Sequence, residues 1–363
     1  MIAGADGVAR PEGTEPRQSP RWWTFQGTGE PARGFLRWPV APPGRRFPGH
    51  AVDGGLPPLD ADERGRHQAG LTAALLGPEE ISAVNVGLAL RRPLLVTGSS
   101  ETGRAGLAHL IARELRLGRV LRWAVNGRTI LRDGIIEEGA AEIGPPDSAA
   151  APGDRGVDPA LMHGAVRRPL RLAPLATALL PRSKPRVLLV DGLDRADHEL
   201  PDDLAEIIER GEVVVPELRG WLSEADPVTV ATDDPGVGVT LDSAVIQCAE
   251  FPVIVLVSDG DREFSPRLRR RCVSVRLPEP SLDELLVLVR ARFGDGPAVA
   301  EVAKRFGALR DAGAGLTVDE LLDAAHLAAA GALDDAAEAD RVLDAIWNAL
   351  SEGTSRWFAG RPS

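Results

Sequence analysis

The stretch that decides the fold runs from residue 93 to residue 117 and reads PLLVTGSSETGRAGLAHLIARELRL. Its first part, LLVT, is apolar and has the length of a short buried strand, and Gly98 follows it directly. After Gly103 the apolar residues recur at the spacing of one helix face. These residues are Leu107, Leu110, Ile111 and Leu115. The stretch therefore predicts a strand, a glycine-bounded turn and an amphipathic helix in direct succession.

The turn has the outline of a phosphate-binding loop, G-x-x-x-x-G-K-[ST], which needs a strand before it and a helix after it. Glycines let backbone N–H groups approach phosphate oxygens, and the helix N-terminus adds a favourable dipole. Two positions depart from the pattern, because Arg104 stands where Lys is usual and Ala105 offers no hydroxyl for Mg²⁺. The candidate phosphate-binding residues are Gly98, Ser99, Ser100, Glu101, Thr102, Gly103, Arg104 and Ala105.

A second apolar run, RVLLVD at 186–191, ends in an acidic residue. In proteins with a phosphate-binding loop, an Asp at the end of such a strand binds the metal, usually through water. The next residue is normally the acid that activates the attacking water. Asp191 holds the first of these positions, whereas Gly192 holds the second. Taken without the loop, the same run is simply a buried strand with an Asp at a turn.

Strands and helices alternate along the middle of the chain. Apolar residues at helical spacing predict helices over 79–90 and 201–210. Apolar runs predict further strands at 120–125, 251–259 and 273–280. Such an alternation favours an α/β fold with a parallel sheet and helices on both of its faces.

After Pro280 the pattern changes to helices only. Residues 281–350 hold thirteen acidic and six basic residues, so much of the net charge of −11 lies here. Ser281 and Thr317 are suitable helix N-caps, and each is followed by acidic residues in the first turn. We expect a small helical domain whose boundary lies near residues 278–281.

The N-terminal part is polar and rich in Gly and Pro. Residues 1–20 predict a disordered tail, and residues 21–78 a strap that carries six of the fifteen aromatic residues. These six are Trp22, Trp23, Phe25, Phe35, Trp38 and Phe47. A strap that covers the core and an arm that binds a partner both fit this composition. A flexible insertion is predicted at 144–160.

Composition excludes several classes of protein. The 363 residues are 44% apolar and 26% charged, an ordinary globular balance for two or three structural units. No run approaches the roughly 18 apolar residues of a membrane span, and residues 1–21 lack a signal-peptide core. Cys248 and Cys272 are too few for a disulfide framework, and net acidity opposes broad nucleic-acid binding. We expect a cytoplasmic protein without membrane or nucleic-acid partners.

Four blocks in order resemble the AAA+ ATPases, and most of all their MoxR-type group. They are VNVGLALRRPLLVTG at 84–98, VLRWAVNGRTILRDG at 120–134, PRVLLVDGLDRADHELPDDLAEIIERGEVVVPEL at 185–218, and FPVIVLVSDGDREFSPRLRRRC at 251–272. The helical segment with GLTVDELLDAAHL at 315–327 also fits. The resemblance implies a P-loop NTPase domain over 79–280 and a helical lid over 281–355.

The resemblance also assigns roles and shows departures. It implies that Asp191 binds Mg²⁺ and that Arg270 and Arg271 act as arginine fingers on the nucleotide of a neighbouring subunit. Family members have an acid where Gly192 stands and Asn where Asp259 stands. Arg104, Ala105, Gly192 and Asp259 are therefore four altered positions in a degenerate site, and Asp194 is a conceivable substitute base.

These features lead to one main expectation and two alternatives. The main expectation is an ATP- or ADP-binding, chaperone-like or scaffold subunit of a ring, typically a hexamer, with impaired hydrolysis and weakly held nucleotide and Mg²⁺. The ring is homomeric or shared with an intact AAA+ subunit, and the resemblance implies von Willebrand A-type partners. The alternatives are a slow ATP hydrolase and an interaction module that binds no nucleotide.

Overall fold

A computed structural model describes most of the chain. It covers residues 20–51 except 33 and 35–37, residues 56, 57, 59 and 63, and residues 76–98, 101–138, 170–260 and 262–347 except 221, 223–226, 315, 334 and 336–338. The predicted tail, apart from Pro20, and the predicted insertion at 144–160 lie outside these residues.

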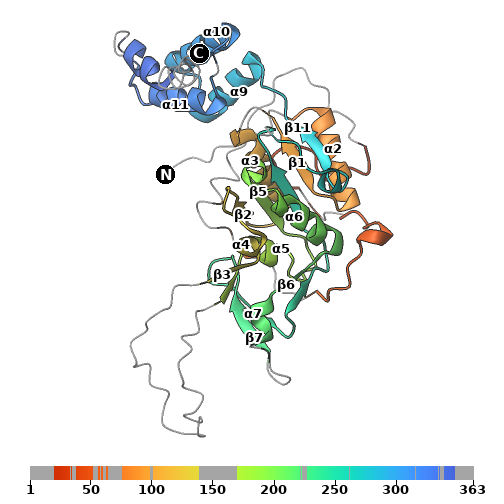
Figure 1. Ribbon diagram of the computed structural model, residues 1–363. Helices are drawn as coiled ribbons and strands as arrows, with labels where there is room; N and C mark the ends of the chain where they lie inside the picture. The colour runs from red at the N-terminus through yellow and green to blue at the C-terminus, as the bar shows by residue number, and fades with distance from the viewer. Residues whose placement is uncertain are drawn as a thin grey trace, which may run out of the picture.

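A five-stranded parallel sheet forms the centre of the fold (Figure 1). Its order is β11-β1-β10-β5-β2, and every neighbouring pair is parallel. The strands are β1 (Leu94–Thr97), β2 (Leu121–Ala124), β5 (Val187–Asp191), β10 (Val253–Val257) and β11 (Val273–Arg276). All five fall on runs that the sequence predicts as strands. The three inner strands, β1, β10 and β5, are covered on both faces and are therefore almost wholly apolar.

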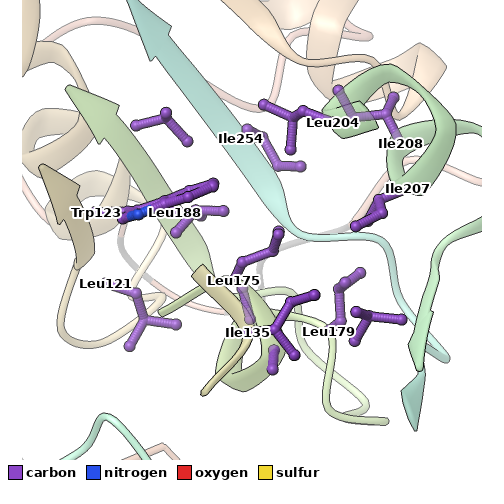
Figure 2. Packing of buried hydrophobic residues seen from close by; sticks show 14 of the residues in the cluster. Leu121, Trp123, Ile135, Leu175, Leu179, Leu188, Leu204, Ile207, Ile208 and Ile254 are labelled. Atoms are coloured by element: carbon purple, nitrogen blue, oxygen red, sulfur yellow. The ribbon is translucent and has the colours of Figure 1, made fainter. Parts of the chain in front are cut away.

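Helices cover both faces of this sheet. On β5, Val187 and Leu189 pack into one apolar cluster, whereas Leu188 and Val190 pack into the other. The first cluster holds α2 (Pro78–Leu90) and α3 (Glu101–Glu114) against the sheet. The second holds α4 (Leu131–Ile135), α5 (Pro174–Ala178) and α6 (Glu199–Arg210), with Trp123 and Leu175 at its centre (Figure 2).

The strand order gives the fold class. The strand before the glycine loop, β1, and the strand that ends in Asp191, β5, are separated by β10. A parallel sheet of this order with helices on both faces is the AAA+ type of P-loop fold. The predicted fold class is thereby confirmed.

Six short strands outside this sheet were not predicted. Four form a sheet of order β3-β4-β7-β8, and two form a separate antiparallel pair, β6-β9. Their bounds are β3 (Ile136–Glu138), β4 (Leu170–Leu172), β6 (Glu212–Val214), β7 (Val228–Ala231), β8 (Gly238–Leu241) and β9 (Val245–Gln247). The short helix α7 (Pro216–Arg219) follows β6. Each of these six strands contains a polar or charged residue, so no apolar run of strand length marks it.

The segment 20–51 is fixed to the domain although the 3₁₀ turn η1 (Pro43–Arg45) is the only regular element among its described residues. Phe25 is fully buried against α2 and α3. The side chain of Asn85 accepts hydrogen bonds from the backbone N–H groups of Thr24 and Phe25 and donates one to the Phe25 carbonyl, at 2.7, 3.0 and 2.7 Å. Backbone that lacks secondary structure thus obtains its partners from a helix side chain.

Arg45 fastens the same segment at a second place. Its guanidinium donates to the carbonyls of Arg91 and Ile208, at 2.8 and 2.6 Å, where α2 and α6 end. It also lies over the ring of Phe251, 4.2 Å from the centroid, and Phe47 stacks on that ring. One cation therefore satisfies two helix C-termini and an aromatic face.

The described elements after Pro280 are helices. They are α9 (Leu282–Phe293), α10 (Pro297–Asp311) and α11 (Val318–Ala329), and residues 339–347 are also helical. Ser281 and Thr317 cap α9 and α11 as predicted, each in a reciprocal capping box with a Glu. These helices share one apolar cluster and form a separate group in Figure 1. Within the described residues, no helix has the length and apolarity that crossing a membrane requires.

Candidate nucleotide-binding site

The candidate residues gather at one edge of the central sheet. Gly98 follows β1, Asp191 ends β5, and Asp259 lies two residues beyond β10. Because β1, β10 and β5 are parallel neighbours, their carboxyl ends meet at the same edge. Arg104 reaches this edge from the first turn of α3. The fold thus brings together residues that are up to 161 positions apart in the sequence.

The glycine loop approaches the neighbouring strand end closely. Gly98 has a φ of +150°, and a Cβ added there would lie 2.6 Å from the carbonyl oxygen of Leu277. Only glycine fits this position without a shift of backbone. Ser99 and Ser100 lie outside the described residues, as do the side chains of Glu101 and Thr102. The close approach is to the protein's own backbone, so it explains why glycine stands at position 98 and does not by itself mark a phosphate site.

Arg104 is turned inward and is 4% exposed. Its Nη1 donates a hydrogen bond to the carbonyl of Gly98, and its Nη2 forms an ion pair with Oδ1 of Asp259. Both terminal nitrogens of the guanidinium therefore have partners within the chain. The guanidinium of Arg104, which the sequence predicts to contact phosphate, is therefore paired with the carboxylate of Asp259.

Asp259 is contacted by groups from two other segments, α3 and the 3₁₀ turn η4 (Leu193–Arg195). Its Oδ2 accepts a hydrogen bond from Arg195, at 3.2 Å, and its backbone N–H donates to Oδ2 of Asp194, at 3.0 Å. The carboxylate thus faces two guanidinium groups, those of Arg104 and Arg195. Asp194, the conceivable substitute base, is used here as a backbone acceptor.

Asp191 has a counter-ion on the next strand. Ala124 of β2 lies opposite Asp191, and Arg122 lies two residues earlier on the same face of β2. Its Nη2 is 2.6 Å from Oδ2 of Asp191, whose side chain is 13% exposed. The carboxylate predicted to bind the metal is therefore bound by an arginine.

The donor set does not fit Mg²⁺. This ion requires near-octahedral oxygen ligands. Ala105 supplies no oxygen, Asp191 is paired with Arg122, and Asp259 is paired with Arg104 and Arg195. Throughout the part of the chain that the structure describes, no group of three or more His, Cys, Asp or Glu side chains is arranged to hold a metal.

Position 192 has a conformation that favours glycine. Gly192 has a φ of +79° and leads into the 3₁₀ turn η4 (Leu193–Arg195). A Cβ there would lie 3.1 Å from the carbonyl of Val125. Side chains other than Gly, Asn and Asp rarely adopt such a backbone. The missing acid is thus accompanied by a turn that suits Gly, Asn or Asp but not Glu.

The arginine run divides into residues with different surroundings. It begins in the short helix α8 (Pro266–Arg269), which Ser265 caps. Arg271 forms an ion pair with Glu209 on α6. Arg270 is exposed and has no ion pair with a residue that the structure describes. The two predicted finger residues therefore differ, and Arg270 is the one left available to another molecule.

The cysteines do not supply a further reactive group. Both are buried, and burial raises the pKa of the Cys248 and Cys272 thiols to about 12. A thiol with such a pKa is almost fully protonated at neutral pH and is a poor nucleophile. Cys272, at the end of the arginine run, is a small apolar residue of the core.

Two functional side chains of this edge were missed in the sequence. Arg122 and Arg195 are more than half exposed and have no motif around them. The one available signal for Arg122 was its position on the strand predicted at 120–125, with alternate residues on one face. Arg195 carried no signal, because its role depends on the 3₁₀ turn after Gly192.

The geometry defines an AAA+ type of P-loop fold with an altered nucleotide edge. No family model matches the sequence, and no curated protein matches it. Forty-nine chains of solved structures match. One of them is NtrX from Brucella abortus in complex with ADP, 13% identical with a TM-score of 0.24. The alignment covers 76% of this chain and 52% of that one, so the chain spans about half its length. The fold assignment therefore rests on the strand order itself.

Proposed function

We propose that this chain is a MoxR-type AAA+ protein that binds nucleotide weakly and does not turn ATP over. Its role is that of a chaperone-like or scaffold subunit in a ring. The observation that carries the proposal is the ion pair between Arg104 and Asp259, which satisfies the loop cation from within the chain.

The surroundings of Asp191 support the absence of turnover. A general base contributes typically about 10²–10⁴-fold to a reaction rate. Gly192 has no carboxylate, and Asp194 accepts the N–H of Asp259. Asp191 is paired with Arg122. The buried Oδ1 of Asp194 has no hydrogen-bond partner among the described residues, so Asp194 is the described carboxylate of this edge that no arginine holds, two positions after the place of the missing base.

The distribution of charge supports the ring. Residues 281–350 have more than twice as many acidic as basic residues, whereas Arg269 and Arg270 are exposed and basic. An acidic segment and a basic segment on one subunit suit head-to-tail contacts between copies or with an intact AAA+ subunit. The family resemblance adds von Willebrand A-type proteins as partners.

Phosphate release from ATP, with Mg²⁺ present, tests the proposal directly. We expect release by the wild-type chain to be no faster than release by an Asp191→Ala variant, which serves as the matched control. Asp191-dependent release at about 1 s⁻¹, a typical enzyme rate, would falsify the proposal and favour the hydrolase alternative. Light scattering tests the ring separately, because a monomeric mass contradicts it.

The same ion pair favours a second candidate function. If Arg104 never leaves Asp259, the chain is an interaction module that binds no nucleotide. Titration with ATP and ADP distinguishes the two candidates, since only the first predicts saturable binding.

A further inference from the structure

We propose that the edge of the central sheet where its strands end binds a nucleoside diphosphate without a divalent cation. Arginines of the chain balance the negative charges that a metal would otherwise balance. The inference rests on the proposed function, because it concerns the ligand of the same site. Three features of the edge lead to it.

The first feature is the pairing of Asp191. The guanidinium of Arg122 is permanently charged and contacts the carboxylate at 2.6 Å. It therefore places a positive charge against Asp191. A metal ion at Asp191 has to displace this cation.

The second feature is the lack of replacement ligands for a metal. Ala105, in the first turn of α3, has no oxygen to offer. Asp259, at the same edge, already contacts two guanidinium groups. Asp194 accepts the N–H of Asp259 through Oδ2, and its buried Oδ1 has no hydrogen-bond partner among the described residues. A divalent cation thus finds this Oδ1 but not the near-octahedral set of oxygens that Mg²⁺ requires, and nucleotide binding gains little from its presence.

The third feature is the balance of charge. The described ion pairs of the edge join three arginines (Arg104, Arg122 and Arg195) to two aspartates (Asp191 and Asp259), and Asp194 lies beside them. Each additional phosphate brings negative charge that Mg²⁺ normally balances. A diphosphate brings less than a triphosphate, so an edge without a metal favours the diphosphate.

Arg104 is the group that recognises the phosphate. Its planar guanidinium is suited to two parallel hydrogen bonds with phosphate oxygens. In the described structure Asp259 occupies one of its terminal nitrogens. A phosphate therefore competes with the Asp259 carboxylate, and binding is weak as long as the ion pair stands.

Substitution of Asp259 tests this competition. In Asp259→Asn the buried Arg104 loses its charge partner, which lowers stability until an anion replaces the carboxylate. We expect ADP to bind about tenfold tighter to this variant than to the wild type. We also expect ADP to raise its melting temperature more. The control is Glu206→Gln, which removes one negative charge from an exposed ion pair on α6.

The closing experiment is calorimetric titration of the full chain with ADP, once with excess EDTA and once with excess Mg²⁺. We expect the affinity in EDTA to equal or exceed that in Mg²⁺. In Arg122→Gln, where Asp191 loses its counter-ion, we expect Mg²⁺ to increase the affinity. Binding of ADP to Asp259→Asn alone, in EDTA, also supports the proposal.

Two results would overturn it. One is wild-type ADP binding that is about tenfold or more tighter with Mg²⁺. The other is the absence of ADP binding in both the wild type and Asp259→Asn, with thermal unfolding showing that both are folded. If the chain does hydrolyse ATP, contrary to the proposed function, Asp191-dependent phosphate release reveals it. Failure of the proposed function and failure of this inference are therefore distinguishable.

Discussion

Arg186 donates two hydrogen bonds to the carboxylate of Asp234, at 2.6 and 2.8 Å, and neither side chain has exposed surface. Arg186 directly precedes β5, whereas Asp234 lies in the turn between β7 and β8. This ion pair therefore joins the central sheet to the small sheet at the end away from the nucleotide edge. Arg119 adds an ion pair to Asp233 at 2.7 Å.

Removal of Arg186 should be costly. We expect Arg186→Met to lower the free energy of unfolding by up to about 3–5 kcal/mol, because the buried Asp234 keeps only the longer ion pair with Arg119, at 3.5 Å. Urea unfolding measures the change. The double variant Arg186→Met with Asp234→Leu should recover much of the loss, since no buried charge remains. Equal stability of the single variant and the wild type contradicts the prediction.

The same pair should make stability depend on acid. Burial alone raises the pKa of Asp234, but hydrogen bonds from Arg186 and the charges of Arg186, Arg119 and Arg182 outweigh it and hold that pKa below the ordinary 3.8. The stabilisation is therefore fully present above pH 3.8 and is lost as the pH falls below it through the folded pKa. Urea unfolding of the wild type and Asp234→Asn should converge below pH 3.8. A difference that stays constant with pH speaks against this assignment.

The N-terminal strap should loosen when Glu114 is removed. This carboxylate accepts hydrogen bonds from the backbone of Gln26 and from the backbone and hydroxyl of Thr28. In Glu114→Ala these donors lose their partner, at about 1–3 kcal/mol for each buried group. Hydrogen exchange of the Gln26 and Thr28 amides should be faster. Glu79→Ala, at an exposed position on α2, is the control and should leave their exchange unchanged.

An acid placed at position 192 should not restore hydrolysis. We expect Gly192→Glu to lose about 1–2 kcal/mol of stability, because the left-handed backbone is unfavourable for a residue with a Cβ. Gly192→Asn should lose less, since Asn tolerates this conformation. Urea unfolding and phosphate release are the measurements. Release by Gly192→Glu that exceeds the wild-type rate shows that the turn adapts.

Substitutions of Arg270 and Arg271 should have different effects on stability and on assembly. Arg270→Ala should leave thermal unfolding unchanged but lower the mass of any assembly measured by light scattering. Arg271→Ala removes the ion pair with Glu209, which is largely exposed, and should reduce stability by no more than about 1 kcal/mol. If Arg270→Ala assembles like the wild type, Arg270 is not an interface residue.

Most of the central sheet could be predicted because its strands are continuous apolar runs. LLVT, VLLVD and VIVLV all form strands at these positions. The strands of the small sheets have three or four residues, and polar residues interrupt most of them. Their pairing depends on neighbours distant in the sequence, so local pattern does not reveal them.

The candidate site was predictable in its members but not in its pairing. Asp191 stands out because it matches the family pattern, and Arg104 and Asp259 stand out because they depart from it. The contact between Arg104 and Asp259 joins residues 155 positions apart. Read in the sequence, Arg104 and Asp259 are two unrelated departures from the family pattern, and nothing there indicates that the two side chains pair. Arg122 likewise acquires its role only when β2 and β5 lie side by side.

The strap has a consequence for the order of folding. Arg45 bonds to a carbonyl 163 positions later, and Phe47 stacks on Phe251. During synthesis the strap therefore leaves the ribosome long before its partners exist. At about 5–20 residues per second, the interval of some 200 residues lasts roughly 10–40 s. The ring of Phe47 remains without its partner for that time, and the domain is completed by a segment that was synthesised early.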